Sequence, residues 1–214
     1  MHPYSGRCFY KFPTEIDGVI SELKALEKFE VAGIVWFFNL IHNHYCDDLY
    51  YSNHILKGIN KLNDCTELNL STHQITDNGL YIIANVMVQL KILCISCELV
   101  SDDGVVAISK INNLQTLELI GSNNVTDSSI KLLKNLTKLK LPCSAKITDD
   151  SVTKVLENSP DMEDLYAEYT SVTVEFIKKA ADISKNRERV LHVGVTFIPD
   201  TKQYESQYFT VHIS

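Results

Sequence analysis

A pattern of apolar and polar positions recurs five times between residues 62 and 181. Each copy starts with apolar residues spaced as in Leu-x-x-Leu-x-Leu. It continues with an aliphatic residue that Thr-Asp or Ser-Asp usually follows, and it ends with apolar residues three or four positions apart. The central apolar residues are Leu68, Leu93, Leu117, Leu139 and Leu165, so successive copies are 25, 24, 22 and 26 residues apart. This nearly constant period predicts a series of similar structural units.

Each copy predicts one β-strand followed by one α-helix. In residues 68–70 the side chains alternate, so both leucines point into the core and Asn69 points outward. A helix is expected to start at Thr76 and Asp77, because the threonine hydroxyl can accept a hydrogen bond from a free backbone N–H and the aspartate suits the positive helix end. The apolar residues that follow at helical spacing are Leu80, Ile83, Ala84 and Met87.

One strand–helix unit cannot bury its own apolar face, whereas a stack of units can. We therefore predict an α/β fold of the leucine-rich-repeat solenoid type, with a curved parallel sheet on the concave face and helices on the convex face. Residues 62–181 would form the regular repeats. Residues 182–214 would form C-terminal capping strands, because the strand pattern returns at residues 190–195 and 208–213 without a Thr-Asp helix start.

The acidic net charge argues against two classes of partner, nucleic acids and anionic membranes. With a formal charge of −7 at pH 7, the chain lacks the basic excess on which nucleic-acid and anionic-membrane surfaces depend. The apolar run at residues 31–41 is shorter than the roughly 18 residues of a spanning helix, and no apolar signal segment follows Met1. We expect a cytoplasmic protein, with the nucleus as the alternative compartment, that binds neither nucleic acid nor membranes.

The repeat resembles the cysteine-containing subtype of leucine-rich repeats. The resemblance covers roughly residues 62–195, and residues 117–127, Leu-Glu-Leu-Ile-Gly-Ser-Asn-Asn-Val-Thr-Asp, match the subtype best. Ser122 and Ser144 stand where the subtype has its cysteine, and Cys97 is the cysteine that remains at this place; serine can still bond to loop backbone. The subtype is best known from F-box/leucine-rich-repeat proteins. The resemblance therefore implies a substrate receptor of a cullin-type ubiquitin ligase, acting in ubiquitin-dependent protein degradation.

Two interpretations of residues 1–61 stay open. Residues 12–41 are similar to a degenerate F-box, since Phe-Pro-Thr-Glu-Ile at 12–16 stands where an F-box opens with Leu-Pro-x-Glu-Ile and Trp36 where a later tryptophan stands. Such a segment would bind a ligase adaptor. In the interpretation that we favour, the pattern Leu-x-x-Phe-x-Val at residues 26–31 is the strand of an irregular first repeat, which caps the stack.

No set of side chains predicts catalysis or a cofactor. His42, His44 and Cys46 share a polar segment, but a zinc site usually takes its ligands from two spaced pairs, and no second pair is visible. Cys94 and Cys97 have the spacing of a redox pair, yet they lie along a predicted strand rather than at a helix N-terminus. We therefore expect neither an enzyme nor a bound metal or cofactor.

The outward positions of the predicted strands form rows on the concave face, where solenoids bind their partners. One row reads Glu67, Ile92, Thr116, Lys138 and Asp164, and the next reads Asn69, Cys94, Glu118, Lys140 and Tyr166. Tyr166 is a candidate hot spot, because aromatic residues often dominate binding energy. The residues that we predict to contact a protein target are Glu67, Asn69, Glu118, Lys138, Lys140, Asp164, Tyr166 and Glu168.

The sequence thus predicts a protein–protein interaction module, and it leaves two functions open. The first, which the resemblance favours, is an F-box-like substrate-recognition subunit of a cullin-type ubiquitin ligase. The second is a stand-alone leucine-rich-repeat scaffold or inhibitor with no ligase link. Residues 12–41 discriminate between them, because the ligase function needs an adaptor-binding segment there.

Overall fold

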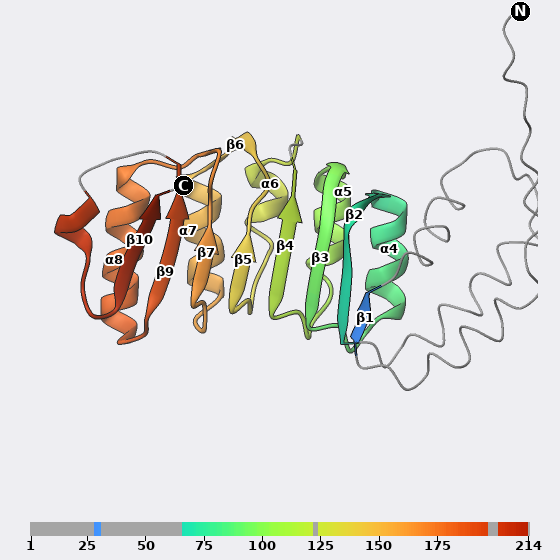
Figure 1. The fold of residues 1–214 in the computed structure, drawn as a ribbon, viewed down its shortest axis with the longest axis horizontal. Helices are drawn as coiled ribbons and strands as arrows, with labels where there is room; N and C mark the ends of the chain where they lie inside the picture. The colour runs from blue at the N-terminus through green and yellow to red at the C-terminus, as the bar shows by residue number, and fades with distance from the viewer. Residues whose placement is uncertain (1–27, 31–65, 122–123, 197–200, 214) are drawn as a thin grey trace, which may run out of the picture.

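The computed structural model describes residues 28–30, 66–121, 124–196 and 201–213, in which strands and helices alternate (Figure 1). The strands of the main sheet are β1 (Lys28–Glu30), β2 (Glu67–Thr76), β3 (Ile92–Leu99), β4 (Thr116–Ile120), β5 (Lys138–Lys140), β7 (Asp164–Tyr166), β9 (Leu191–Val195) and β10 (Phe209–Ile213). The helices are α4 (Asp77–Val86), α5 (Asp102–Ile108), α6 (Asp127–Ile130), α7 (Asp149–Asn158), α8 (Val174–Arg187) and the 3₁₀ helix η3 (Thr201–Tyr204). Two further strands, β6 (Ser144–Thr148) and β8 (Thr170–Ser171), pair with each other.

The main sheet is parallel and follows the order of the chain. Within the described residues it holds eight strands in the order β1-β2-β3-β4-β5-β7-β9-β10, and every neighbouring pair is parallel. Figure 1 shows helices α4 to α8 on one side of this sheet, so strands and helices form two layers. The predicted α/β class with a parallel sheet is therefore confirmed.

The register confirms the units that the sequence pattern predicts. The central residues of the five copies lie opposite one another in one line across the sheet, and each is at most 1% exposed: Leu68, Leu93, Leu117, Leu139 and Leu165. Val193 continues the line on β9 and is also buried. The core lies between this line of leucines and the buried residues of the helices, such as Leu80 and Ile83 of α4.

The predicted strand in residues 26–31 is present as β1. It pairs in parallel with β2, with Phe29 opposite Leu68, which extends the line of central residues by one strand. The rest of the F-box-like segment at residues 12–41 lies outside the described residues, as do the predicted metal-capable segment around His42 and most of the N-terminal cap.

The predicted curvature is not observed, because the sheet of the described residues is not curled (Figure 1). Curvature arises where the helix layer takes more length per unit than the roughly 4.8 Å between neighbouring strands. In the middle of the stack the helices are short, since α5 has 7 residues and α6 only 4. We call the face of the main sheet that none of the described helices covers the open face.

The predicted helix starts are confirmed, with one exception in their capping. In four of the five described α-helices the Ser or Thr before the helix accepts a hydrogen bond from the backbone N–H two residues on, as Thr126 does from Ser128. The side chain of Thr76 makes no such cap bond, so the predicted cap of α4 is wrong.

The aspartates at the helix starts bind the next unit of the stack. Asp127 accepts hydrogen bonds from the N–H and the hydroxyl of Thr148, at 2.8 and 2.6 Å. Asp102 accepts the same pair from Thr126, at 2.8 and 2.7 Å. Equivalent pairs of bonds join Asp77 to Ser101 and Asp149 to Thr173. We call these four pairs the aspartate ladder.

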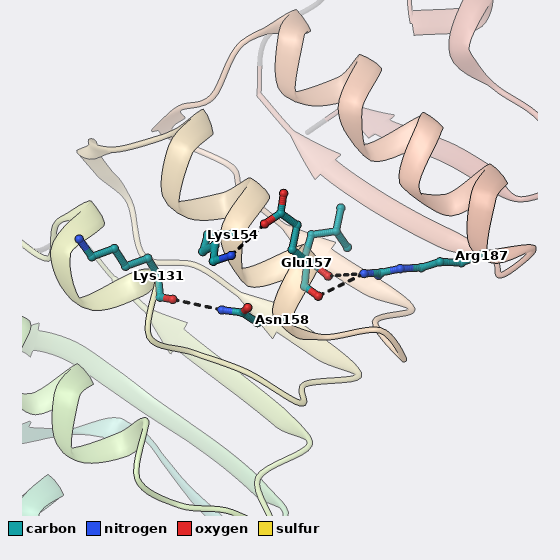
Figure 2. A network of polar contacts seen from close by, with 6 residues as sticks. Lys131, Lys154, Glu157, Asn158 and Arg187 are labelled. Carbon is teal, nitrogen blue, oxygen red and sulfur yellow. Dashed lines mark hydrogen bonds and ion pairs between the residues drawn. The ribbon is translucent and has the colours of Figure 1, made fainter.

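The C-terminal ends of the helices are also joined to the next unit (Figure 2). The Asn158 side chain donates to the Lys131 carbonyl at the end of α6, at 3.4 Å. The Arg187 guanidinium donates to the carbonyls of Leu156 and Ser159 at the end of α7, at 3.0 and 3.3 Å. The Lys131 carbonyl lies at the C-terminal end of α6, where carbonyls have no partner within the helix. The carbonyls of Leu156 and Ser159 accept from Arg187 in addition to the backbone N–H groups of Ser159 and Met162.

The C-terminal region differs from the prediction in the length of α8. The predicted boundary at residue 181 falls inside this helix, which continues to Arg187 and ends at Glu188 with a left-handed φ of 51°. The apolar pattern stops early because the inward position near the end of α8 holds Ser184, whose buried hydroxyl donates to the Arg189 carbonyl at 2.7 Å. The predicted strands at 190–195 and 208–213 are present as β9 and β10, which pair in parallel.

Candidate functional site on the open face of the sheet

The open face carries the rows that the alternation predicts. Across β2, β3, β4, β5, β7 and β9 the register aligns Glu67, Ile92, Thr116, Lys138, Asp164 and His192 in one row, and Asn69, Cys94, Glu118, Lys140, Tyr166 and Gly194 in the next. The leucines between these positions are buried on the helix side. The predicted site residues therefore share one face, although they do not form one cluster.

A charged and aromatic cluster occupies the middle of the open face. Glu118 Oε1 lies 2.8 Å from Lys138 Nζ, and the same ammonium group lies 5.9 Å from the centre of the Tyr166 ring. The hydrogen bond from Lys138 lowers the pKa of Glu118, and the bond to Glu118 raises the pKa of Lys138. Both groups are therefore ionised at neutral pH, and Lys138 links the carboxylate of β4 to the ring of β7.

Tyr166 is seated on Gly194, its neighbour in the row. A Cβ at Gly194 would lie 2.6 Å from Cδ1 of Tyr166, which is closer than real Cβ atoms approach. Glycine at this position therefore lets the ring lie down on β9. Together with the ammonium group of Lys138, this contact holds the ring in a defined orientation while the side chain stays half-exposed.

Lys140, Asp164 and Glu168 surround this ring and remain partly exposed. Lys140 lies opposite Tyr166 in its row, and it forms no ion pair with any described residue. Asp164 lies between Lys138 and His192. Glu168 follows β7 two residues after Tyr166, and its carboxylate would lie 3.2 Å from a Cβ at Gly194.

Glu67 and Asn69 lie apart from the cluster, on β2. Three strand spacings, about 14 Å, separate β2 from β5. The Asn69 side chain accepts a hydrogen bond from the Ser71 N–H at 3.0 Å, so its amide supports the local turn of β2. The structure thus brings six of the eight predicted residues together and leaves these two outside.

The sequence prediction missed the residues that β9 and β10 add to the open face. His192 and Gly194 continue the two rows on β9, and Thr210 and His212 continue them on β10. The ring of His192 bonds to Thr210 Oγ1 at 2.5 Å and lies 6.0 Å from the ring of His212. The signal was present, because extending the spacing of the fifth copy to Leu-His-Val-Gly-Val at 191–195 places these residues in the rows.

The cysteines and serines of the strand ends have structural roles. Burial raises the pKa of Cys94 to about 11 and that of Cys97 to about 12, and both are free thiols. Protonated thiols at neutral pH are poor nucleophiles, which argues against a redox pair. Cys97 donates to the carbonyl of Ile120 at the end of β4, at 3.1 Å, and Ser144 donates to the Val125 carbonyl, at 2.7 Å.

A scan against protein-family models and a search of curated proteins find no match to this chain. None of the helices in the described part of the chain combines the length and apolar character that a membrane span requires. In residues 66–121, 124–196 and 201–213, no three His, Cys, Asp or Glu side chains are grouped to hold a metal ion. The functional argument therefore depends on the open face itself.

Proposed function

We propose that this protein is a leucine-rich-repeat solenoid that binds a protein partner on its open face. The observation that carries the proposal is the cluster of Glu118, Lys138 and Tyr166, in which an aromatic ring is held half-exposed on a surface that no other element of the described residues covers. Ordered aromatic residues lose little conformational entropy on binding, and they are frequent among the residues that dominate interfaces.

The repeated architecture supports the leucine-rich-repeat assignment. Five central leucines align in one line, each strand is followed by a helix on the same side, and the aspartate ladder links successive units. In repeat proteins of this kind each unit contacts mainly its neighbours, and the stacked strands offer an extended surface to a partner.

Within this proposal, the stand-alone module is favoured over the ubiquitin-ligase receptor. The resemblance of the repeats supports the receptor, which would bind a ligase adaptor through residues 12–41. However, β1 takes residues 28–30 of that segment into the parallel sheet beside β2. Co-purification of the full chain with an F-box-binding adaptor, lost on removal of residues 1–61, would reverse this preference.

The direct test compares two tyrosines on opposite faces. Tyr166→Ala removes the ring of the open face, and Tyr81→Ala removes a ring of α4 that is 54% exposed and also has a lysine ammonium group over it, at 5.2 Å. Proteins captured from cells by the full chain should be quantified for both variants and the parent. We expect Tyr166→Ala to lose the partner that the parent captures and Tyr81→Ala to retain it, with thermal melts unchanged.

The reverse result contradicts the proposal. If Tyr81→Ala releases the partner while Tyr166→Ala keeps it, the helix side is the working surface. If neither variant changes the captured proteins, the Tyr166 cluster has no part in binding.

A further inference from the structure

We propose that the part of the open face on β7 and β9 receives a basic side chain, arginine or lysine, of the protein partner. This inference depends on the proposed function, because it specifies the chemistry of a partner that binds on the open face. Its centre is the Tyr166 ring, and its acidic groups are Asp164 and Glu168. We call these three residues the β7 triad.

The β7 triad combines two residues of β7 with one of the turn that follows it. Asp164 and Tyr166 lie two residues apart on the strand, so they share its open face, and the Glu168 carboxylate lies on the same face, 3.2 Å from a Cβ at Gly194. All three side chains are half-exposed. A ring between two carboxylates suits a cation, which is attracted by the face of the ring and by the negative charges beside it.

The ring already has a cation beside it within the molecule. Lys138 Nζ lies 5.9 Å from the centre of the ring, but it is also bonded to Glu118 on β4 at 2.8 Å. Lys138 therefore approaches from the β5 side and is largely neutralised by Glu118. On the β9 side, the ring lies over Gly194, and the Glu168 carboxylate lies beside it, 3.2 Å from a Cβ at Gly194.

No lysine or arginine comes from the strands on the β9 side of the ring. Residues 162–173, 190–196 and 208–213, which include β7, β9 and β10, contain three carboxylates and no basic residue apart from two histidines. Lys140 on β5 marks the border, so the surface changes from basic to acidic between β5 and β9. A partner that places its basic side chain beyond Tyr166 avoids repulsion by Lys140.

The charge of the whole chain favours the same partner. The formal net charge is −7, so the long-range field attracts a basic segment and repels an acidic one. An acidic segment would find Lys140 as a single ion-pair partner, with Asp164 and Glu168 beside it. Charge complementarity therefore selects the basic occupant over the acidic one.

The test uses two short peptides of defined chemistry and the full chain labelled with ¹⁵N. The basic probe is acetyl-Gly-Arg-Gly-Arg-Gly-amide, and the acidic probe carries glutamate in place of arginine. We expect the basic probe to shift the amide signals of Tyr166, Gly194 and their neighbours, with weaker shifts at higher salt. The acidic probe should leave these signals in place.

Two double variants separate the contribution of the β7 triad to binding of the basic probe from the contribution of the net charge of the chain. Asp164→Asn with Glu168→Gln removes two charges from the β7 triad, and Asp150→Asn with Glu157→Gln removes two from α7 on the helix side. We expect the first double variant to lower the affinity for the basic probe about fivefold, because it removes both carboxylates beside the ring. The second should change its affinity by less than about twofold, which is the effect of net charge alone.

The outcomes distinguish this inference from the proposed function. If the acidic probe shifts the β7 triad, or if both double variants weaken the basic probe equally, the basic-side-chain inference is wrong. The proposed function then still stands when Tyr166→Ala loses the captured partner. If Tyr166→Ala leaves the partner bound, the proposed function fails, whatever the peptides do.

Discussion

Each aspartate of the aspartate ladder acts in two units at once. Asp127 begins α6, where its charge suits the positive helix end, and it also accepts two hydrogen bonds from Thr148 of the next unit. Thr148 in turn accepts the Asp150 N–H at the start of α7. The pair of Asp127 and Thr148 thus connects the starts of α6 and α7. Loss of either side chain is expected to weaken both the cap of α7 and the contact between the two units.

Substitution of the capping threonines tests this arrangement. Thr148→Ala removes the cap of α7 and one bond to Asp127, and we expect it to lower the free energy of unfolding by about 1–2 kcal/mol. Thr126→Ala should have a similar effect through α6 and Asp102. The measurement is the urea midpoint, with the slope of the transition unchanged.

Thr153→Ala is the matched control inside α7. Its hydroxyl is buried and has no hydrogen-bond partner, so alanine removes no bond and suits a helix better. We expect its midpoint to equal or slightly exceed that of the parent. An equal loss in Thr148→Ala and Thr153→Ala would show that the cap contributes nothing.

The aspartate ladder also predicts how stability depends on pH. Burial raises the pKa of Asp102 and Asp127, but the hydrogen bonds from their Thr and Ser partners outweigh it, so both pKa values lie below the ordinary value. A lowered folded pKa gives stability that is fully present above the unfolded value of about 3.9 and is lost as pH falls through the folded value.

We therefore expect the urea midpoint to be constant from pH 5 to 7 and to fall below about pH 4. Asp102→Asn with Asp127→Asn should be less stable than the parent at pH 7 and should lose less on acidification. A double variant that loses as much as the parent between pH 5 and 3 would show that other carboxylates cause the acid sensitivity.

At the scale of the elements, side-chain hydrogen bonds join neighbouring units of the stack at both ends of their helices. Aspartates accept hydrogen bonds at the N-terminal ends, while Asn158 and Arg187 donate them to carbonyls at the C-terminal ends. Negative groups thus lie at positive helix ends and a positive group at a negative one. Neighbouring helices are therefore fixed relative to each other even where α6 is a single turn.

Arg187 is the strongest of the C-terminal joints and can be tested alone. Arg187→Ala removes the charged donor that joins α8 to the carbonyls of Leu156 and Ser159, which keep only their backbone donors, and we expect a loss of about 1 kcal/mol in the free energy of unfolding. Arg189→Ala is the control, because the ion pair of Arg189 with Asp161 is exposed on both sides and should contribute less. Equal urea midpoints for the two variants would contradict the assignment of Arg187 as a joint.

The elements were largely predictable, because they follow from local patterns. The period of the leucines gives the strands, the Ser-Asp step gives the start of α5, and the Thr-Asp steps give the starts of α6 and α7. The aspartate ladder was not predicted, because its bonds join residues about 24 positions apart and leave no local signal. The flatness of the sheet was missed for a similar reason, since it depends on how the helix layer packs.

The candidate site was predictable in part. Alternation placed Glu118, Lys138 and Tyr166 on one face, and the register brought them together. The sequence pattern could not show that Tyr166 lies over Gly194, because this contact depends on the direction of one side chain. It also could not show that Asn69 turns back to its own loop.

At the scale of the whole molecule, the two faces of the sheet carry different kinds of residue. The helix side buries the core and carries the bonds that join the units. The open face carries a charged, aromatic and histidine-containing region from β4 to β10, whereas β3 contributes the uncharged Ile92 and Cys94 to the two rows. This asymmetry is the basis of the claim that a partner binds to the open face of the stack.

Photo-crosslinking at single positions tests this claim most directly. A photoreactive phenylalanine derivative is placed at Thr116 or His192 on the open face, and at Leu132 or Lys154, which are exposed on the helix side. After irradiation in cells, we expect positions 116 and 192 to form the same crosslinked product, and positions 132 and 154 to form none. Products from the helix-side positions alone would contradict the account.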